Sequence, residues 1–211
     1  MRRTLFLFFL LTSCFAFSQI QQYFFVDDVD YVEYLYVEIC IGEDGKTTSV
    51  TEIPEKSTYK NKENINYIIE YRKQFDFYPE SKFVNQCFEY SFKLVNSKYE
   101  SLKATHINCK EKFERGKFIY ISPETAKDVK IIRRKRKQIE KDKTSRSVYK
   151  IEWTSSSSYT LTHMKLTEPE SQYLIGQKME VKILDILDDG SYFYYANLSD
   201  RTYGFGIIKK K

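Results

Sequence analysis

Glycine, proline and histidine are scarce in this chain of 211 residues, which contains 7 Gly, 4 Pro and 2 His. So little glycine and proline argues against a collagen-like or disordered chain. The sequence has no phosphate-binding loop, no dinucleotide fingerprint and no Gly-x-Ser-x-Gly nucleophile turn. The two histidines, His106 and His163, show no metal-ligand spacing with the cysteines. We therefore expect no cofactor, no metal ion and no enzymatic activity.

Carboxylates are plentiful, as in Asp27–Asp28 and Asp188–Asp189. Acid–base catalysis needs side chains that converge in space, and abundance alone does not provide such a site. A hydrolase with an unrecognised carboxylate site stays an alternative that depends on the fold.

Aromatic residues, in contrast, make up 17% of the chain, with 18 Tyr and 16 Phe. Tyr and Phe favour pleated, half-buried surfaces, so the composition indicates β-sheet. The formal net charge is +5, and two of the cations, Arg2 and Arg3, lie in a segment that we expect to be removed. The mature chain would be only mildly basic, and we expect no nucleic-acid partner.

The N-terminal residues indicate export. The two arginines precede an apolar run from Leu5 to about Phe17, and Ala16 and Ser18 are small residues at the positions that a signal peptidase reads. This pattern predicts a signal peptide over residues 1–18. The run of roughly 13 residues is shorter than the ~20 that span a bilayer. Residues 11–14, LTSC, also resemble a lipobox, so lipidation of Cys14 is the alternative, and we expect a periplasmic, outer-membrane-associated or secreted protein.

Residues 19–97 have the pattern of a small α+β domain. Residues 31–41 alternate, with Leu35, Val37, Ile39 and Ile41 on one face, which predicts a strand. Gly45 lies in the following turn, where it can take a positive φ, and residues 47–53 match a return strand. Isoleucines at helical spacing predict a helix over 64–75, capped by Asn64 and ended before Pro79. Alternation over 84–95 predicts a third strand.

This order of elements carries a resemblance to a known family. The Val-x-Ile-x-Ile-x-Glu-Asp-Gly-Lys hairpin at 37–46 and the Phe-Asp-Phe-Tyr-Pro segment at 75–79 resemble the C-terminal domain of TonB, a periplasmic module that meets outer-membrane transporters. The family has an apolar, Ala-rich helix, whereas this helix carries Tyr, Glu, Arg and Lys. We find no inner-membrane anchor and no long Pro-rich spacer in the sequence. The resemblance therefore implies the binding module without the transducing role.

A small sheet with an exposed edge can accept an extended peptide as an additional strand. We expect the third strand of this domain to be that edge, with these partner-binding residues: Val84, Gln86, Phe88, Tyr90 and Phe92. The alternative is that this sheet only packs against the second half of the chain.

Removal of the signal segment leaves Cys40, Cys87 and Cys109, an odd number for an oxidising compartment. Cys40 and Cys87 fall on the same face of the predicted sheet. They would form a disulfide if their strands are neighbours, and the sequence leaves open whether any pair forms.

Residues 98–108 are polar and have no sustained period, which is typical of a linker. In residues 109–211, apolar segments alternate with turns every eight to twelve residues or so, beginning with a strand at 113–120, and no helical period is present. This pattern predicts an antiparallel meander or a small barrel.

The second half also carries a resemblance. The segments Cys109-x-x-x-Phe-x-x-Gly, Tyr149-x-Ile-Glu-Trp, Tyr159-x-Leu-Thr and Tyr203-Gly-x-Gly-x-Ile-Lys resemble a group of small secreted bacterial proteins of unknown function. In that group a cysteine often lies between the Trp and the Tyr-x-Leu-Thr segment, where this chain has Ser155–Ser158. The resemblance implies that Cys109 has lost its disulfide partner.

Two sets of residues in this half are candidate sites. The aromatic residues would either line a ligand cavity in a barrel or fill its core: Trp153, Tyr159, Tyr192 and Tyr194. The basic run would either contact an anion or form a solvated turn between Ile132 and Ile139: Arg133, Arg134, Lys135, Arg136 and Lys137.

Together these patterns predict an α+β protein in which a small β-β-α-β module is followed by an all-β antiparallel meander or small barrel. We expect an exported, non-enzymatic cell-envelope protein that binds a protein or peptide by β-strand addition. The alternative is a carrier that holds a small ligand in a barrel cavity of the C-terminal domain. The sequence does not indicate the oligomeric state.

Overall fold

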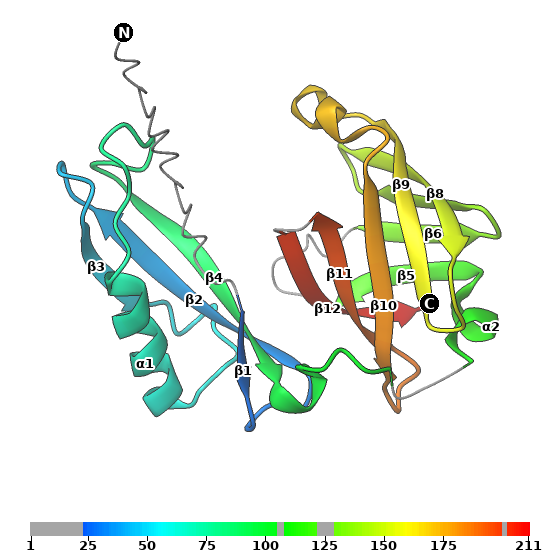
Figure 1. The fold of residues 1–211 in the computed structure, drawn as a ribbon, viewed down its shortest axis with the longest axis horizontal. Coiled ribbons are helices and arrows are strands. Elements are labelled where there is room, and N and C mark those ends of the chain that lie inside the picture. The colour runs from blue at the N-terminus through cyan, green and yellow to red at the C-terminus, as the bar shows by residue number, and fades with distance from the viewer. Residues whose placement is uncertain (1–22, 105–107, 122–128, 200–201) are drawn as a thin grey trace, which may run out of the picture.

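The computed structural model describes residues 23–104, 108–121, 129–199 and 202–211. The predicted signal peptide, Cys14 and His106 lie outside these ranges. The described chain is mostly β and forms a four-stranded sheet followed by a closed eight-stranded antiparallel barrel (Figure 1). None of its helices is both long enough and apolar enough to cross a bilayer.

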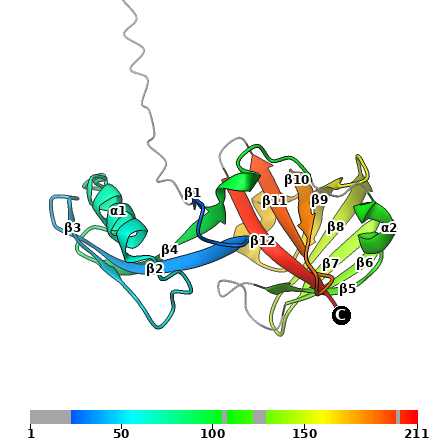
Figure 2. The same ribbon diagram turned by 90° about the horizontal axis from the view of Figure 1, so that it is seen from below.

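The first part of the described chain combines the four-stranded sheet with one helix. Its elements are β1 (Tyr23–Val26), β2 (Val32–Ile41), β3 (Thr47–Glu52), α1 (Lys62–Lys73) and β4 (Cys87–Asn96). The strand order is β1-β4-β2-β3, with β1 parallel to β4 and the other pairs antiparallel. Helix α1 lies over one face of the sheet (Figures 1 and 2). The strand-strand-helix-strand order of the prediction is present, with β1 as an additional strand.

Local sequence explains the boundaries of these elements. Gly45 has φ +82° in the β2–β3 turn, and a Cβ at this position would lie 2.3 Å from the Phe77 carbonyl oxygen. Only glycine fits both conditions, as the turn pattern predicted. The predicted helix cap, Asn64, is wrong by about one turn. The side chain of Asn61 is the cap and accepts hydrogen bonds from the backbone N–H groups of Glu63 and Asn64.

The barrel is an up-and-down meander. Its strands are β5 (Gly116–Ile121), β6 (Lys130–Arg134), β7 (Lys137–Lys141), β8 (Arg146–Trp153), β9 (Ser158–Leu166), β10 (Lys178–Ile186), β11 (Tyr192–Ser199) and β12 (Thr202–Lys210). Pairing of β12 with β5 closes the barrel. The sequence predicted an antiparallel meander or a small barrel, and the structure has the closed antiparallel barrel.

Two short helical elements in this half were not predicted. Helix α2 (Cys109–Phe113) precedes β5, so Phe113 belongs to a helix and not to the first strand. The 3₁₀ helix η2 (Pro169–Leu174) lies in the β9–β10 connection. Helices this short contain too little of a 3.6-residue period to be recognised.

The sheet and the barrel share an apolar core. After β4, the 3₁₀ helix η1 (Ser97–Tyr99) places Tyr99 at 1% exposure among Val95 of β4 and barrel residues of β10, β11 and β12. The buried members of this core are Val95, Tyr99, Leu184, Phe193 and Phe205. The first residues of the predicted linker therefore pack as part of the fold.

Candidate functional site

Strand β4, which the sequence predicted as a sheet edge, stands between β1 and β2 in the strand order. It pairs with β2 over its length, but β1 lies beside it over Lys93–Asn96 only and does not extend beside Cys87–Phe92. Val84 and Gln86 precede the strand, and Phe88, Tyr90 and Phe92 pack into the core beneath α1. The alternating apolar positions that suggested a binding surface are the positions that the helix covers.

Strand β3 forms one edge of the sheet. Ile53 donates its N–H to the Tyr36 carbonyl, and the β2–β3 register pairs Glu38 with Thr51 and Cys40 with Ser49. Because backbone groups alternate along a strand, Val50 and Glu52 direct their N–H and C=O groups away from β2. No other strand of the described chain pairs with this side of β3.

The start of β3 is partly covered. Phe77 donates its N–H to the Gly45 carbonyl, and the Thr47 hydroxyl donates to the Phe75 carbonyl at 2.6 Å. The regular part of the edge therefore runs from Ser49 to Glu52, after a register shift near the turn. It contains no proline and no lysine, two residue types that commonly protect an exposed edge.

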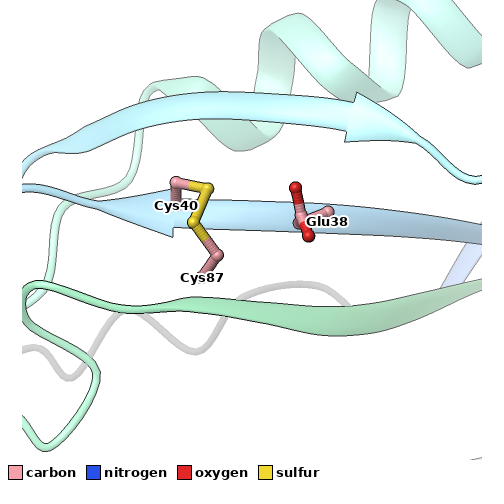
Figure 3. A group of neighbouring side chains, drawn as sticks. All are labelled: Glu38, Cys40 and Cys87. Carbon is pink, nitrogen blue, oxygen red and sulfur yellow. A yellow bond between two sulfur atoms is a disulfide. The ribbon is translucent and has the colours of Figure 1, made fainter.

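The predicted disulfide is present. Cys40 on β2 and Cys87 on β4 are directly opposite in the register and form a disulfide with a Cα–Cα distance of 4.0 Å. Figure 3 shows the bridge across the two strands with Glu38 beside it. Glu38, Cys40 and Cys87 form a cluster of potential metal ligands among the described residues, but both sulfur atoms are held in the disulfide and offer no thiolate.

Cys109 is the third cysteine of the described chain. It is buried at the start of α2 and is not part of a disulfide. The N–H of Lys110 donates to the Ser156 carbonyl at 2.8 Å, so this helix lies beside the serine-rich β8–β9 turn. Burial raises the pKa of the Cys109 thiol.

Inside the barrel, a buried arginine organises one end of the interior. Arg133 is 2% exposed. Its Nε donates to Gln138 Oε1 at 2.9 Å, its Nη1 donates to the Phe113 carbonyl at 3.0 Å, and its Nη2 lies 3.0 Å from the hydroxyls of Tyr159 and Tyr192. The guanidinium also lies over the Phe118 and Tyr159 rings. Side chains around Arg133 thus fill the end of the barrel next to α2.

The predicted cavity residues consequently have different environments. Tyr159 and Tyr192 are fully buried around Arg133, which agrees with the core interpretation. Trp153 and Tyr194 pack against the same interior cluster but keep partial exposure. The four side chains do not together form one open wall.

A carboxylate continues the interior network. Glu140 Oε1 accepts hydrogen bonds from Gln138 Nε2 at 2.7 Å and from the Tyr120 hydroxyl at 2.9 Å. Burial raises the pKa of Glu140, whereas these hydrogen bonds and the Arg133 charge act in the opposite direction. Glu140, Tyr120 and Tyr194 are half-buried.

His163 is the one histidine of the described chain, and it is 6% exposed. Its ring lies 4.8 Å from the Tyr149 ring, and neither ring nitrogen has a hydrogen-bond partner in the described structure. Burial lowers the pKa of His163. Sequence reasoning missed both His163 and Glu140. The available signal was the alternation along the two strands: Glu140 lies on the same face of β7 as Gln138, and His163 lies on the same face of β9 as Leu161.

The basic run is divided between the two faces of the barrel wall. Arg133 points inward and cannot contribute to an exposed anion site, which corrects the prediction for this residue. Arg134, Lys135, Arg136 and Lys137 are exposed. Side chains alternate between the two faces of β6, so neighbouring residues of the basic run lie on opposite sides of the wall. The charge pattern of the sequence did not reveal this separation.

Searches of the chain against protein families, curated proteins and solved structures found no match. The resemblances to the TonB C-terminal domain and to small secreted proteins therefore stay predictions from the residues.

Proposed function

We propose that the protein is an exported, non-enzymatic binding protein of the cell envelope, and that its sheet binds an extended segment of a protein partner by strand addition at β3. One observation carries the proposal: Val50 and Glu52 direct their backbone groups away from β2 at the edge of the sheet. An extended peptide beside them would complete the hydrogen-bond ladder. The Cys40–Cys87 disulfide supports an oxidising compartment.

The test is photocrosslinking in the cells that make the protein, with a photoreactive amino acid in place of the exposed Thr51. The same amino acid in place of Lys178, which is exposed on the barrel, serves as the position control. One dominant protein adduct at Thr51 that is absent at Lys178 is the expected result.

A matched pair of variants separates backbone pairing from side-chain contact. Glu52→Pro removes an outward N–H group and also the carboxylate that binds Lys62 at 2.8 Å. Glu52→Ala removes the carboxylate only. Strand addition predicts that the adduct is lost in Glu52→Pro and kept in Glu52→Ala. Equal adducts in both variants, or no adduct at Thr51, would refute it.

A carrier function is a second candidate, because Glu140, Tyr120 and Tyr194 retain exposure inside a closed wall. Eight-stranded barrels are wide enough to hold one small ligand. The probe would be the neutral fluorophore N-phenyl-1-naphthylamine, with energy transfer from Trp153, the single tryptophan of the chain. Saturable transfer that disappears in Ala196→Phe, which fills the interior, and persists in the outward control Thr162→Phe would support a carrier. Transfer unchanged by Ala196→Phe would argue against it.

A further inference from the structure

The outer wall of β6, β7 and β8 carries an ordered pattern of charge. The strand register aligns Lys130, Lys141 and Arg146 in one row across the three strands. It aligns a second row at the other end of the same wall, composed of Arg134, Lys137 and Lys150. Between these rows lies a third one, which is apolar and consists of Ile132, Ile139 and Val148.

These rows face outward. Gln138 and Glu140 of β7 and Arg133 of β6 belong to the interior network, so the intervening residues of each strand lie on the opposite face. All six cationic residues of the two rows are exposed. Positions two apart along a strand are separated by ~6.6–6.8 Å, so the two rows lie about 13 Å apart across the apolar row.

These rows of like charge do not stabilise the folded chain. Like charges directly opposite each other on neighbouring strands repel, and both rows consist of such pairs. No acidic residue occupies a position in the three rows, and Lys150 is the one member with an ion pair in the described structure, at 2.9 Å from Glu152. The whole chain has a formal net charge of only +5, so general basicity does not explain six cations on one wall.

An apolar groove adjoins the rows. It has a volume of about 600 Å³, and its floor includes Val148, Met164 and Leu166. A register shift between β8 and β9 sets Lys165 opposite Val148 and places Met164 beside it, and Met164 is 51% exposed. Cationic residues surround this floor: Arg136, Lys137, Arg146, Lys150 and Lys165.

We propose that this wall binds a membrane surface that carries anionic lipid headgroups. The two cationic rows would contact phosphate groups, while the partly exposed Ile139 and the exposed Met164 enter the boundary between headgroups and acyl chains. A nucleic acid fits the pattern less well, because a polyanion groove combines cations with aromatic stacking residues and the row between the cations is aliphatic. The site is separate from the β3 edge and does not depend on strand addition.

The test is flotation of the purified full-length protein with vesicles of equimolar phosphatidylglycerol and phosphatidylcholine, compared with vesicles of phosphatidylcholine alone. The wild-type protein should bind the anionic vesicles, and salt should weaken this binding. The triple variant Lys137→Gln, Lys141→Gln, Arg146→Gln should lose about fivefold for each cation, or about a hundredfold in total. Because opposed like charges are removed, this variant should be as stable as the wild type or more stable.

The matched control is Lys103→Gln, Lys178→Gln, Lys182→Gln, which makes the same charge change at other positions of the chain. It should retain most of the binding. Equal losses in both triple variants would show that net charge alone drives binding and would overturn the proposal, as would failure of the wild type to bind anionic vesicles.

A second variant separates a membrane from a soluble polyanion. Ile139→Asn should weaken vesicle binding severalfold, because it removes apolar contact with the boundary region. Binding of heparin or duplex DNA that exceeds vesicle binding and is unchanged by Ile139→Asn would assign the wall to a polyanion and overturn the membrane proposal.

Discussion

The hydroxyl of Tyr99 donates a 2.7 Å hydrogen bond to Oδ2 of Asp185, which connects the segment after β4 to barrel strand β10. Tyr99 is also buried in the core that the sheet and the barrel share. Tyr99→Phe should lower the free energy of unfolding by about 1–3 kcal/mol, because a carboxylate loses a donor in a partly buried site. Tyr99→Ala should lower it by about 3–5 kcal/mol, because it also leaves a cavity.

Urea denaturation would measure these changes, with Tyr67→Phe as the control, since Tyr67 is 65% exposed on α1. The control should stay within about 0.5 kcal/mol of the wild type. If Tyr99→Phe were as stable as Tyr67→Phe, the Tyr99–Asp185 bond would have no role in joining the two parts.

The second prediction concerns the buried Arg133. Arg133→Ala should lower the free energy of unfolding by about 3–5 kcal/mol, because Gln138 Oε1, the Phe113 carbonyl and two tyrosine hydroxyls lose their shared partner. Arg133→Met, which keeps an apolar stem, should lose less. The neighbouring Arg134→Ala provides the control, because Arg134 is exposed and its removal should change stability by about 0.5 kcal/mol or less. Guanidinium denaturation would compare the three variants, and similar losses at both arginines would contradict the interior network.

The third prediction concerns pH. Burial lowers the pKa of His163 from its ordinary value of 6.5, so the unfolded chain takes up a proton at a higher pH than the folded chain. The stability contributed by neutral His163 is therefore complete above about pH 6.5 and is lost as the pH falls through the lowered folded-state pKa. His163→Phe should remove this loss and keep the ring contact with Tyr149.

Unfolding free energies at about pH 7 and about pH 5 would test this effect as a difference between variant and wild type. The comparison must be made this way because the raised pKa of Glu140 contributes with the opposite sign, favouring the folded chain at low pH. An equal change with pH in both proteins would show that His163 is not protected from protonation.

The fourth prediction concerns the Cys40–Cys87 disulfide, whose cysteines are 47 residues apart. Its reduction should lower the free energy of unfolding by about 2–4 kcal/mol, because the unfolded chain gains conformational entropy. Urea denaturation with and without a thiol reductant would measure the change. Cys109→Ala should keep the reductant effect, whereas the double variant Cys40→Ser, Cys87→Ser should lack it. A reductant effect that persists in the double variant would place its cause elsewhere.

Local features of the fold were predictable from the sequence because they depend on short-range periodicity and steric rules. Alternation over 31–41 and 84–95 predicted β2 and β4, and the Asp-Gly turn predicted the positive φ of Gly45. The sequence predicted a Cys40–Cys87 disulfide on the condition that the two strands are neighbours. The structure meets this condition, because the two cysteines are directly opposite each other in the β2–β4 register.

The edge of the sheet could not be read in the same way. Strand order depends on which strands find partners far along the chain, and β1 occupies the place beside β4. In the resulting strand order β1 and β3 stand at the two ends of the sheet, and β1 lies beside β4 over Lys93–Asn96 only.

By itself, the sequence determined that this is a β-rich chain with a helix in its first half and repeated strands in its second. Period two, turn residues and aromatic content act over a few residues and need no knowledge of distant contacts. Tertiary structure alone decided the rest. Barrel formation made the face of β6 that carries Arg133 the interior and left Arg134 on the outer face. The registers of β6 with β7 and of β7 with β8 aligned Lys141 with Lys130 and Arg146. The physical reason is that strand register and barrel closure depend on pairing between segments far apart in the chain. A run of basic residues in the sequence does not show which of its members face the interior and which face solvent.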